Sequence, residues 1–494
     1  MVGRGVVSRR QSAPTAPGEV VLQPAIVRPD VFGRTHPDPR ADPPTVVLDP
    51  SRARTEELQQ VGPETPHIPT IAGAPQGAAP DPDSEADTDG IPVVAHPADD
   101  GRAMALRALL GSAGALVGWL VAAHLVPPGA LGGAQLAVSL FLLVGGLAPL
   151  ALGLFGSPRP GRLAWLAPAA VLPVAAAVGA ACGLALPRLA AGSVLPGLPP
   201  IVGPLLVAAG CAGWAVLFAH DAVLAGAGKA RWTVWRTVVL APVQIGALVA
   251  LCAVAGLGAP GVVLSWLGPA VLCAVLGAAV LPVLLRRGPA GASRGQAALG
   301  VVGAALLHHL VPIVVTVRFG PETGAAFFVA WQVFVVVDLA AAYTVHALSG
   351  AVAREPRRTD ALVARARKRL FIVFLPVIAL GAGLAGPLLA AFGAAYGEAG
   401  DLLRLMLLGL AFRLVVAHEV GVRQALGHGL GFDRLQLFSA VLVLVVAIAL
   451  PVTAVGVTEL RLVAIGYIIV QVACAAAVLV IPAVRRTDVE VRAP

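Results

Sequence analysis

The sequence has little charge, no paired cysteine pattern and none of the short motifs of common enzyme families. Only 13% of its 494 residues are charged, whereas 57% are hydrophobic and the mean hydropathy is +0.85. Its five cysteines lie within apolar stretches and show no CxxC spacing, which excludes a disulfide framework and a zinc site. No GxxxxGKS/T phosphate loop, no HExxH motif and no basic stripe interleaved with aromatic residues is present. A chain this apolar is an integral membrane protein, and we expect no enzymatic activity, cofactor, metal or nucleic-acid partner.

Residues 1–100 differ from the rest of the chain. They hold 8 Arg against 15 Asp and Glu, are rich in Pro and Ala, and show no apolar periodicity. Such a composition cannot bury enough surface to offset chain entropy, so we predict a disordered cytoplasmic tail. The tail is interpreted as a solvated spacer, with regulation by phosphorylation or by a cytoplasmic partner as the alternative. Two adjacent arginines near the start have no apolar region behind them, so a cleavable signal peptide is not expected.

From residue 104 onward, twelve apolar runs are long enough to cross a hydrocarbon core of ~30 Å. The sequence therefore predicts an all-α, polytopic membrane protein with about twelve transmembrane helices. We predict a tail at 1–100, a six-helix lobe at 101–290, a second six-helix lobe at 291–486 and a short cytoplasmic tail at 487–494. The predicted spans are 104–126, 134–156, 162–186, 200–226, 233–257, 261–285, 297–318, 325–349, 369–393, 399–424, 436–457 and 461–482.

The distribution of Lys and Arg predicts the orientation of the spans. With the N-terminus inside, 22 of these residues fall at cytoplasmic flanks and four at outer flanks. Positively charged loops stay in the cytoplasm, so both termini are expected there, in a plasma (inner) membrane protein. The basic link at 354–369, between spans eight and nine, is expected to be the largest cytoplasmic loop and to lie on the anionic leaflet as an amphipathic helix.

Two internal similarities indicate that a six-helix unit was duplicated in parallel, giving two pseudo-symmetric bundles. LVPPGALGG (125–133) and RFGPETG (318–324) each join two long apolar segments, and setting Gly132 against Gly324 brings these segments into register. FAHDAVLAGAGKA (218–230) is similar to VAHEVGVRQALGHG (416–429), and both contain Ala, His and an acid in succession. Internal repeats of this kind are typical of transporters built around a central site.

Ionisable side chains inside the spans are the candidates for function, because such groups are costly in lipid and usually face a bundle interior or a wet cavity. The candidates are His220, Asp221, His308, His309, Asp338, Arg413, His418, Glu419 and Arg423.

These candidates have structural and functional interpretations. Glu419 and Arg423 are four residues apart, which favours a local ion pair. Asp338 and Arg413 are expected at similar depth and could pair across the second bundle. Alternatively, Asp338 or Asp221 takes part in coupling to a proton or sodium ion.

The adjacent histidines His308 and His309 precede Pro312 by one helical turn. They point about 100° apart, so at most one of them can face a given cavity squarely. Contact with an anion in the cavity and hydrogen bonding between helices both remain open for this pair.

Several stretches resemble the Wzx-like lipid-linked oligosaccharide flippases, the polysaccharide-transport branch of the multidrug, oligosaccharidyl-lipid and polysaccharide exporter superfamily. The resemblance covers about 105–485 and is carried by LVPPGALGGAQLAVSLF, RFGPETGAAFFVAWQVF, LAGAGKARWTVWRTVVLAPVQ, GAPGVVLSW and, after AAYGEAG, DLLRLMLLGLAFRLV.

This resemblance implies two six-helix lobes that rock about a central cavity. It implies as cargo a polyprenyl-diphosphate-linked glycan whose lipid stays in the membrane, as in polysaccharide biosynthesis at the cell envelope. The cavity would be lined by the first, second, seventh and eighth helices, which places His308, His309, Asp338 and Arg318 near it.

Three alternatives to a flippase remain open. One is a cation-coupled drug or metabolite antiporter of the same superfamily, and another is a polytopic glycosyltransferase or polymerase. The last is a scaffold that brings partners to the membrane through the tail and the 354–369 link.

Overall fold

The computed structural model describes residues 27–29, 35–37, 97–154, 167–189, 195, 197–285, 298–426, 429–450 and 456–480. It divides into two compact units, Met1–Ile91 and Pro92–Pro494. In the first unit, β1 (Val27–Pro29) pairs antiparallel with β2 (Thr35–Pro37). Composition did not predict this short pair. The remaining residues of the predicted tail up to 96, and the predicted tail at 487–494, lie outside the described residues.

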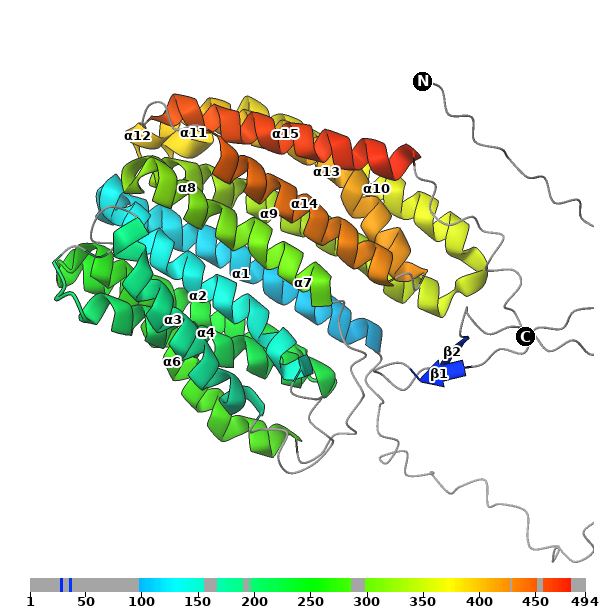
Figure 1. Ribbon diagram of the computed structural model, residues 1–494, viewed down its shortest axis with the longest axis horizontal. Helices are drawn as coiled ribbons and strands as arrows, with labels where there is room; N and C mark the ends of the chain where they lie inside the picture. The colour runs from blue at the N-terminus through cyan, green and yellow to red at the C-terminus, as the bar shows by residue number, and fades with distance from the viewer. Residues whose placement is uncertain are drawn as a thin grey trace, which may run out of the picture. The chain divides into compact units, whose positions relative to one another are not determined.

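The second unit is helical, and its described helices follow the twelve predicted spans in order (Figure 1). The first half comprises α1 (Pro97–Leu125), α2 (Pro128–Leu154), α3 (Ala167–Leu189), α4 (Val202–Gly226), α5 (Arg231–Val249) with the π-helical segment η2 (Ala250–Val254), and α6 (Gly258–Leu285). The second half begins with α7 (Ala298–Ala305), the π-helical segment η3 (Leu306–Leu310), α8 (Val311–Phe319) and α9 (Pro321–Arg354). It continues with η4 (Pro356–Arg358), α10 (Thr359–Gly383), α11 (Ala385–Ala390), α12 (Ala394–Gly397), α13 (Gly400–Ala425), α14 (Gly429–Ala449) and α15 (Val457–Val480).

Ten of the described helical segments are long and apolar enough to cross a membrane. Helix α14 adds a shorter apolar stretch, Arg434–Ala449, and α10 begins with basic residues before its apolar part. The prediction of an all-α, multi-pass membrane protein is therefore confirmed. We define the outer end of the bundle as the end that holds the α1–α2 turn and Gly320, and the inner end as the opposite one, in accordance with the predicted orientation.

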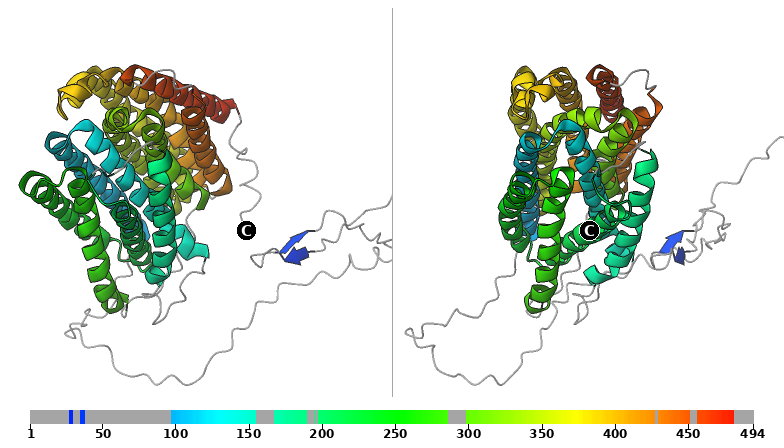
Figure 2. Two further views of the ribbon diagram at one scale, coloured as in Figure 1. Left: turned by 60° about the vertical axis from the view of Figure 1, so that its left-hand side comes forward. Right: turned by 90° about the vertical axis from the view of Figure 1, so that its left-hand side faces the viewer.

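The two halves pack against each other through a limited set of helices, which we call the seam. Helices α1 and α2 of the first half contact α9 of the second half, and α2 also contacts α7, η3 and α8. Figure 2 shows the blue and cyan helices of the first half lying beside the yellow-green helices of the second. The first and second spans thus pack against the seventh and eighth, the four that the family resemblance places around a cavity.

Close backbone contact at the outer end depends on two glycines that the internal repeat places in register. A Cβ atom at Gly132 of α2 would overlap the backbone of Pro321, the first residue of α9. A Cβ atom at Gly324 of α9 would overlap Thr316 of α8. The two halves therefore approach at the outer end more closely than any larger residue at Gly132 would allow.

The turns at the outer end are shorter than predicted. Helix α2 begins at Pro128 rather than near 134, and α9 begins at Pro321 rather than near 325. Proline fits the first turn of a helix because its missing N–H would have no helical partner there. Gly320 has a φ of 86°, a left-handed conformation that glycine adopts readily, and it alone separates α8 from α9.

The basic link between the eighth and ninth spans is not the long loop that we predicted. Helix α9 continues to Arg354, η4 forms a single turn, and α10 begins at Thr359. The apolar side chains Leu362, Val363 and Ala366 of α10 pack on a small cluster of Leu348, Val352 and Val422 from α9 and α13. The basic segment is thus the start of α10, which runs on to Gly383 but is not among the ten segments long and apolar enough to cross a membrane, and the apolar face of its first turns lies on protein.

Candidate functional site

The widened turn η3 and the proline that follows it position His308. Pro312 has no N–H, so the carbonyl oxygen of His308, four residues earlier, lacks its usual helical donor. The indole Nε1–H of Trp331 on α9 donates to that oxygen at 3.2 Å. Short π-helical segments inside spanning helices are frequent at functional sites. Here the segment and the Trp331 hydrogen bond fix the direction of one of the two adjacent histidines.

His308 belongs to a buried charged triad with Asp338 of α9 and Arg413 of α13. Its Nε2 atom lies 2.9 Å from Asp338 Oδ2, and Arg413 Nε donates to Asp338 Oδ1 at 2.6 Å. The residues are 9%, 2% and 4% exposed, respectively. Both carboxylate oxygens of Asp338 are therefore occupied, and the predicted pairing of Asp338 with Arg413 is confirmed. A buried ion pair of this kind needs such close geometry to offset the cost of desolvation.

A polar layer lies behind the triad, between α13 and α15. Gly409 leaves the space that the Tyr467 ring fills, and Gln471, one turn further along α15, donates to Ser439 of α14 at 3.1 Å. Within the described part of the chain, Arg413 Nη1, Tyr467 Oη and Gln471 Oε1 are buried without a hydrogen-bond partner. Unpaired polar atoms are costly in an apolar interior, so this layer is suited to taking up internal water.

The first half buries a different charged cluster near its inner end. Asp221 of α4 forms ion pairs with Arg107 of α1 and Arg236 of α5. The carboxylate side chain is 2% exposed and each arginine side chain is 16% exposed. Arg107 also stacks over the ring of Phe218, with its guanidinium carbon 4.9 Å from the ring centroid. Two cations thus surround one anion, and the cluster carries an excess positive charge.

The remaining predicted residues do not join these two clusters. The His309 ring centroid is 6.5 Å from that of His308, and the two rings are nearly perpendicular. Arg318 donates to the carbonyl oxygen of Ala447 at 2.8 Å, which places it on the outer end of α14. The ring of His220 fills the space left by Gly277 on α6, and its Nδ1 atom is buried without a partner in the described residues.

Two further candidates lie near the inner end of α13. Glu419 accepts a hydrogen bond from Arg423 Nε at 2.8 Å, so the predicted local ion pair is confirmed. The Nε2 atom of His418 lies 3.4 Å from the carbonyl oxygen of Val363 on α10. Both residues therefore lie at the inner end and are separate from the triad.

A polar contact crosses the seam itself. Thr316 of α8 donates to Gln135 Oε1 of α2 at 3.0 Å, and Gln135 Nε2 donates to Ser139 Oγ at 3.1 Å. All three side chains are buried. Sequence reasoning missed Gln135 and Thr316 because only ionisable groups were treated as candidates. Polar uncharged residues at the start of the second apolar run and at the end of the seventh would have pointed to them.

Sequence reasoning also missed the roles of Arg107 and Arg236, which were counted only as charges at cytoplasmic flanks. Arg236 lies within the predicted fifth span, at 233–257, and that position was the available signal. Within the described ranges, no three His, Cys, Asp or Glu residues are grouped closely enough to hold a metal ion.

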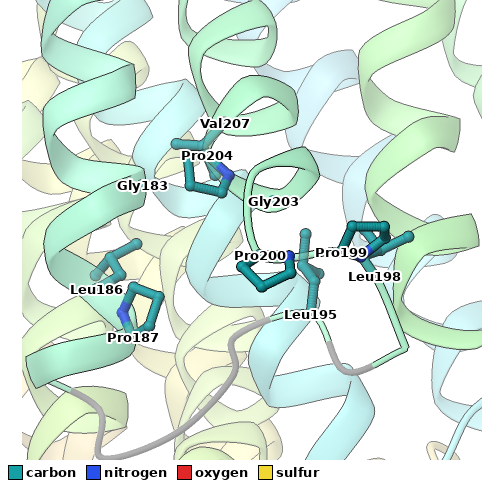
Figure 3. A pocket seen from close by; sticks show the side chains of 10 residues that line it. All are labelled: Gly183, Leu186, Pro187, Leu195, Leu198, Pro199, Pro200, Gly203, Pro204 and Val207. Atoms are coloured by element: carbon teal, nitrogen blue, oxygen red, sulfur yellow. The ribbon is translucent and has the colours of Figure 1, made fainter.

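An apolar pocket of about 320 Å³ lies away from both clusters, where the outer end of α3 meets the start of α4 (Figure 3). None of the predicted site residues lines it. Its lining residues are Gly183, Leu186, Pro187, Leu195, Leu198, Pro199, Pro200, Gly203, Pro204 and Val207.

The arrangement of two helical halves joined at a central seam is a fold found in solved membrane transporters. The chain is similar to a multidrug resistance MATE family transporter of the MOP superfamily in its inward-facing conformation, with a TM-score of 0.54 and 17% identity over 76% of this chain and 96% of that chain. It is also similar to a MATE in complex with MaL6, with a TM-score of 0.51 and 17% identity over 77% of this chain and 94% of that chain.

A third similar structure is a MOP superfamily transporter from Pyrococcus furiosus Vc1, for which a reversed polarity of the binding pocket suggests a different function. Its TM-score is 0.51, with 18% identity over 77% of this chain and 94% of that chain. No protein-family model matches the sequence, and no curated protein is detectably similar to it. At these identities the structural similarity establishes the MATE-like fold.

Proposed function

We propose that this chain is an alternating-access transporter of the plasma membrane that flips a polyprenyl-diphosphate-linked oligosaccharide. The observation that carries the proposal is the excess positive charge of the cluster formed by Arg107, Asp221 and Arg236. A diphosphate is recognised best by cations that can donate several hydrogen bonds, and arginine provides this geometry.

The position of the cluster also supports an anionic cargo. Arg107 is on α1, a helix of the seam that packs on α9 of the second half. The cluster is near the inner end, where a lipid-linked precursor made in the cytoplasm would arrive. Asp221 neutralises only one of its two cations, so a phosphate group that reaches the cluster would meet one unbalanced positive charge.

The triad has a different role in this proposal. Because both oxygens of Asp338 are occupied by Arg413 and His308, the triad holds α9, α13 and η3 together in this conformation. If Asp338 or Asp221 couples transport to a proton or sodium gradient, its replacement by Asn will abolish gradient-driven transport. Unchanged gradient-driven transport in both Asn variants would exclude such coupling.

The second candidate is a cation-coupled drug or metabolite antiporter. The similar multidrug resistance MATE transporter favours it. The two candidates differ in the charge of their cargo, so they predict opposite effects of removing a buried cation.

The test compares two cargoes in vesicles that contain the full chain. A short-chain fluorescent polyprenyl-diphosphate oligosaccharide reports flipping when it becomes inaccessible to a quencher added outside, and ethidium reports drug export. We expect flipping of the diphosphate lipid and a loss of at least tenfold in Arg107→Gln, because one cation–phosphate contact is worth about 1.5–3 kcal/mol. Arg236 remains to pair with Asp221 in this variant.

Arg404→Gln is the matched control, because it removes an arginine of an exposed ion pair with Asp401 far from the cluster. This variant should flip the lipid at the wild-type rate. Export of ethidium without movement of the diphosphate lipid would overturn the proposal and favour the antiporter.

A further inference from the structure

Helix α10 carries an exposed stripe of cations at its inner end. Arg365, Lys368 and Arg369 are three and four residues apart and therefore share one face of the helix. All three are exposed, and no ion pair joins them to any residue within the described ranges. The stripe is thus unpartnered positive charge on a regular helix.

The opposite face of α10 is attached to the protein. Its buried residues Leu370, Phe374 and Ile378 continue the line of Val363, which packs on the ends of α9 and α13. At about 100° per residue, this buried line lies roughly opposite Arg365. The cations therefore point away from the bundle, and α10 lies beside α13 at the bundle's edge (Figure 1).

The residues that follow the stripe on the same face of α10 indicate what surrounds the cations. Ile372, seven residues after Arg365, is 61% exposed, and Leu380 further along is 64% exposed. In a membrane protein, large apolar side chains exposed on the outside of the helical bundle face lipid chains. Arg365 is about 10 Å nearer the inner end than Ile372 along the helix, so the cations follow the exposed apolar surface on its inner side, where headgroups would lie beside it. A lipid headgroup reaches this position directly, whereas a soluble protein would have to displace the headgroups first.

We propose that Arg365, Lys368 and Arg369 form a binding site for the phosphate of an anionic phospholipid in the inner leaflet. The three side chains offer charge-assisted hydrogen bonds to phosphate oxygens, and each basic residue near an anionic surface contributes about 1 kcal/mol, a roughly fivefold change in affinity. The site is independent of the proposed cargo, since it faces lipid on the outside of the second half and the charged clusters lie inside.

Occupation of this site would act on the transport machinery through α10. The helix packs on α9 and α13, which carry Asp338 and Arg413, and His418 of α13 contacts the α10 backbone at Val363. A lipid that holds α10 in place therefore stabilises the inner end of the second half. Transport activity should depend on the anionic lipid content of the membrane.

The test uses the purified full chain in nanodiscs of phosphatidylcholine to which phosphatidylglycerol is added in steps. Lipid retained by the protein is counted by native mass spectrometry, and the melting temperature is followed by tryptophan fluorescence. We expect phosphatidylglycerol to bind and to raise the melting temperature of the wild type. In Arg365→Gln/Arg369→Gln the affinity should fall about 30-fold.

The control variant Arg357→Gln/Arg367→Gln removes the same charge from η4 and from another face of α10, where Arg367 is exposed but lies on the side of the buried line rather than in the stripe. It should keep the wild-type response to phosphatidylglycerol. The single variant Lys368→Gln gives an independent measurement, with an expected loss of about fivefold, if the double variant is poorly folded. Equal losses in the stripe and control variants, or equal binding of phosphatidylcholine and phosphatidylglycerol by the wild type, would overturn the proposal.

Discussion

The two halves use equivalent positions for different purposes. When the two repeats are aligned, Asp221 of α4 corresponds to Glu419 of α13, and each directly follows a histidine. In the first half the acid is 2% exposed and binds arginines from two other helices. In the second half the acid side chain is 16% exposed and pairs with Arg423 of its own helix. The same sequence motif thus connects three helices in the first half. In the second half its acid pairs within its own helix.

Among the described residues, the buried charge of the deep interior lies in the second half and not in the first. The second half places the His308, Asp338 and Arg413 triad in its core. The first half has tryptophans there instead, with the Trp119 and Trp266 rings stacked at 5.3 Å and Trp214 at 5.9 Å from Trp266. Duplication therefore preserved the helical scaffold, while the buried charge came to lie near the inner end of one half and in the middle of the other.

The largest expected effect is at the triad. Arg413→Gln leaves Asp338 buried without its cation, and loss of one member of a buried pair typically costs about 3–5 kcal/mol. We expect a loss of stability of this size, measured as a fall in the melting temperature of the purified protein. The double variant Arg413→Gln/Asp338→Asn removes both charges and should recover part of the loss. A double variant less stable than the single variant would contradict the assignment of a compensated pair.

A comparison of the two repeat acids tests the difference between the halves directly. Asp221→Asn leaves Arg107 and Arg236 close together without their anion, with an expected loss of about 3 kcal/mol, because both arginines are mostly buried. Glu419→Gln should cost about 0.5 kcal/mol, as for other partly exposed pairs four residues apart on a helix. Both are measured by thermal unfolding in the same detergent. Similar losses in the two variants would show that the halves are not different in this respect.

Gly132 provides a test of whether the close approach of the two halves at the outer end is required. Gly132→Ala introduces a methyl group against the Pro321 backbone, and overpacking of this kind costs about 1–3 kcal/mol. We expect the outer end to open, so that a cysteine introduced at the buried position Thr323 reacts faster with a membrane-impermeant maleimide in a cysteine-free background. Gly129→Ala is the control from the same helical turn, since no atom lies within 4 Å of its added Cβ. Equal labelling in both variants would argue against closure at Gly132.

The smallest effect concerns the hydrogen bond across the seam. Thr316→Val removes the donor to Gln135 and should cost about 1 kcal/mol, with a further rise in maleimide labelling at the outer end. Thr344→Val removes a hydroxyl that bonds only to the Ala340 carbonyl of its own helix, so it should leave labelling unchanged. An equal response of the two threonine variants would mean that the Gln135 contact does not hold the halves together.

Hydropathy predicted twelve spans, and the described helices bear out ten of them, because length and apolarity alone decide whether a helix can cross a bilayer. It could not locate helix ends outside the apolar core, so the starts at Pro128 and Thr359 were placed too late. The basic residues before 369 do not interrupt a helix, since Arg and Lys are good helix formers.

The partners of buried charges were predictable only where depth along a helix decided them. Asp338 and Arg413 lie at similar depth, and their pairing could be expected. The third member, His308, could not be assigned, because the π-helical segment changes the direction of every side chain beyond it. Arg107 and Arg236 were misjudged for another reason: a flexible arginine side chain near a membrane surface can reach either the headgroups or a buried acid.

The widened turn at η3 has a consequence for how the two adjacent histidines are used. A π-helical turn amounts to one additional residue inserted into an otherwise α-helical ladder. Deleting a single residue between Leu306 and Leu310 would restore the regular ladder and rotate the preceding segment relative to the following one by about 100°. Relative to α7, His309 would then occupy the position that His308 occupies now. A length difference of one amino acid therefore selects which imidazole faces the Asp338 carboxylate.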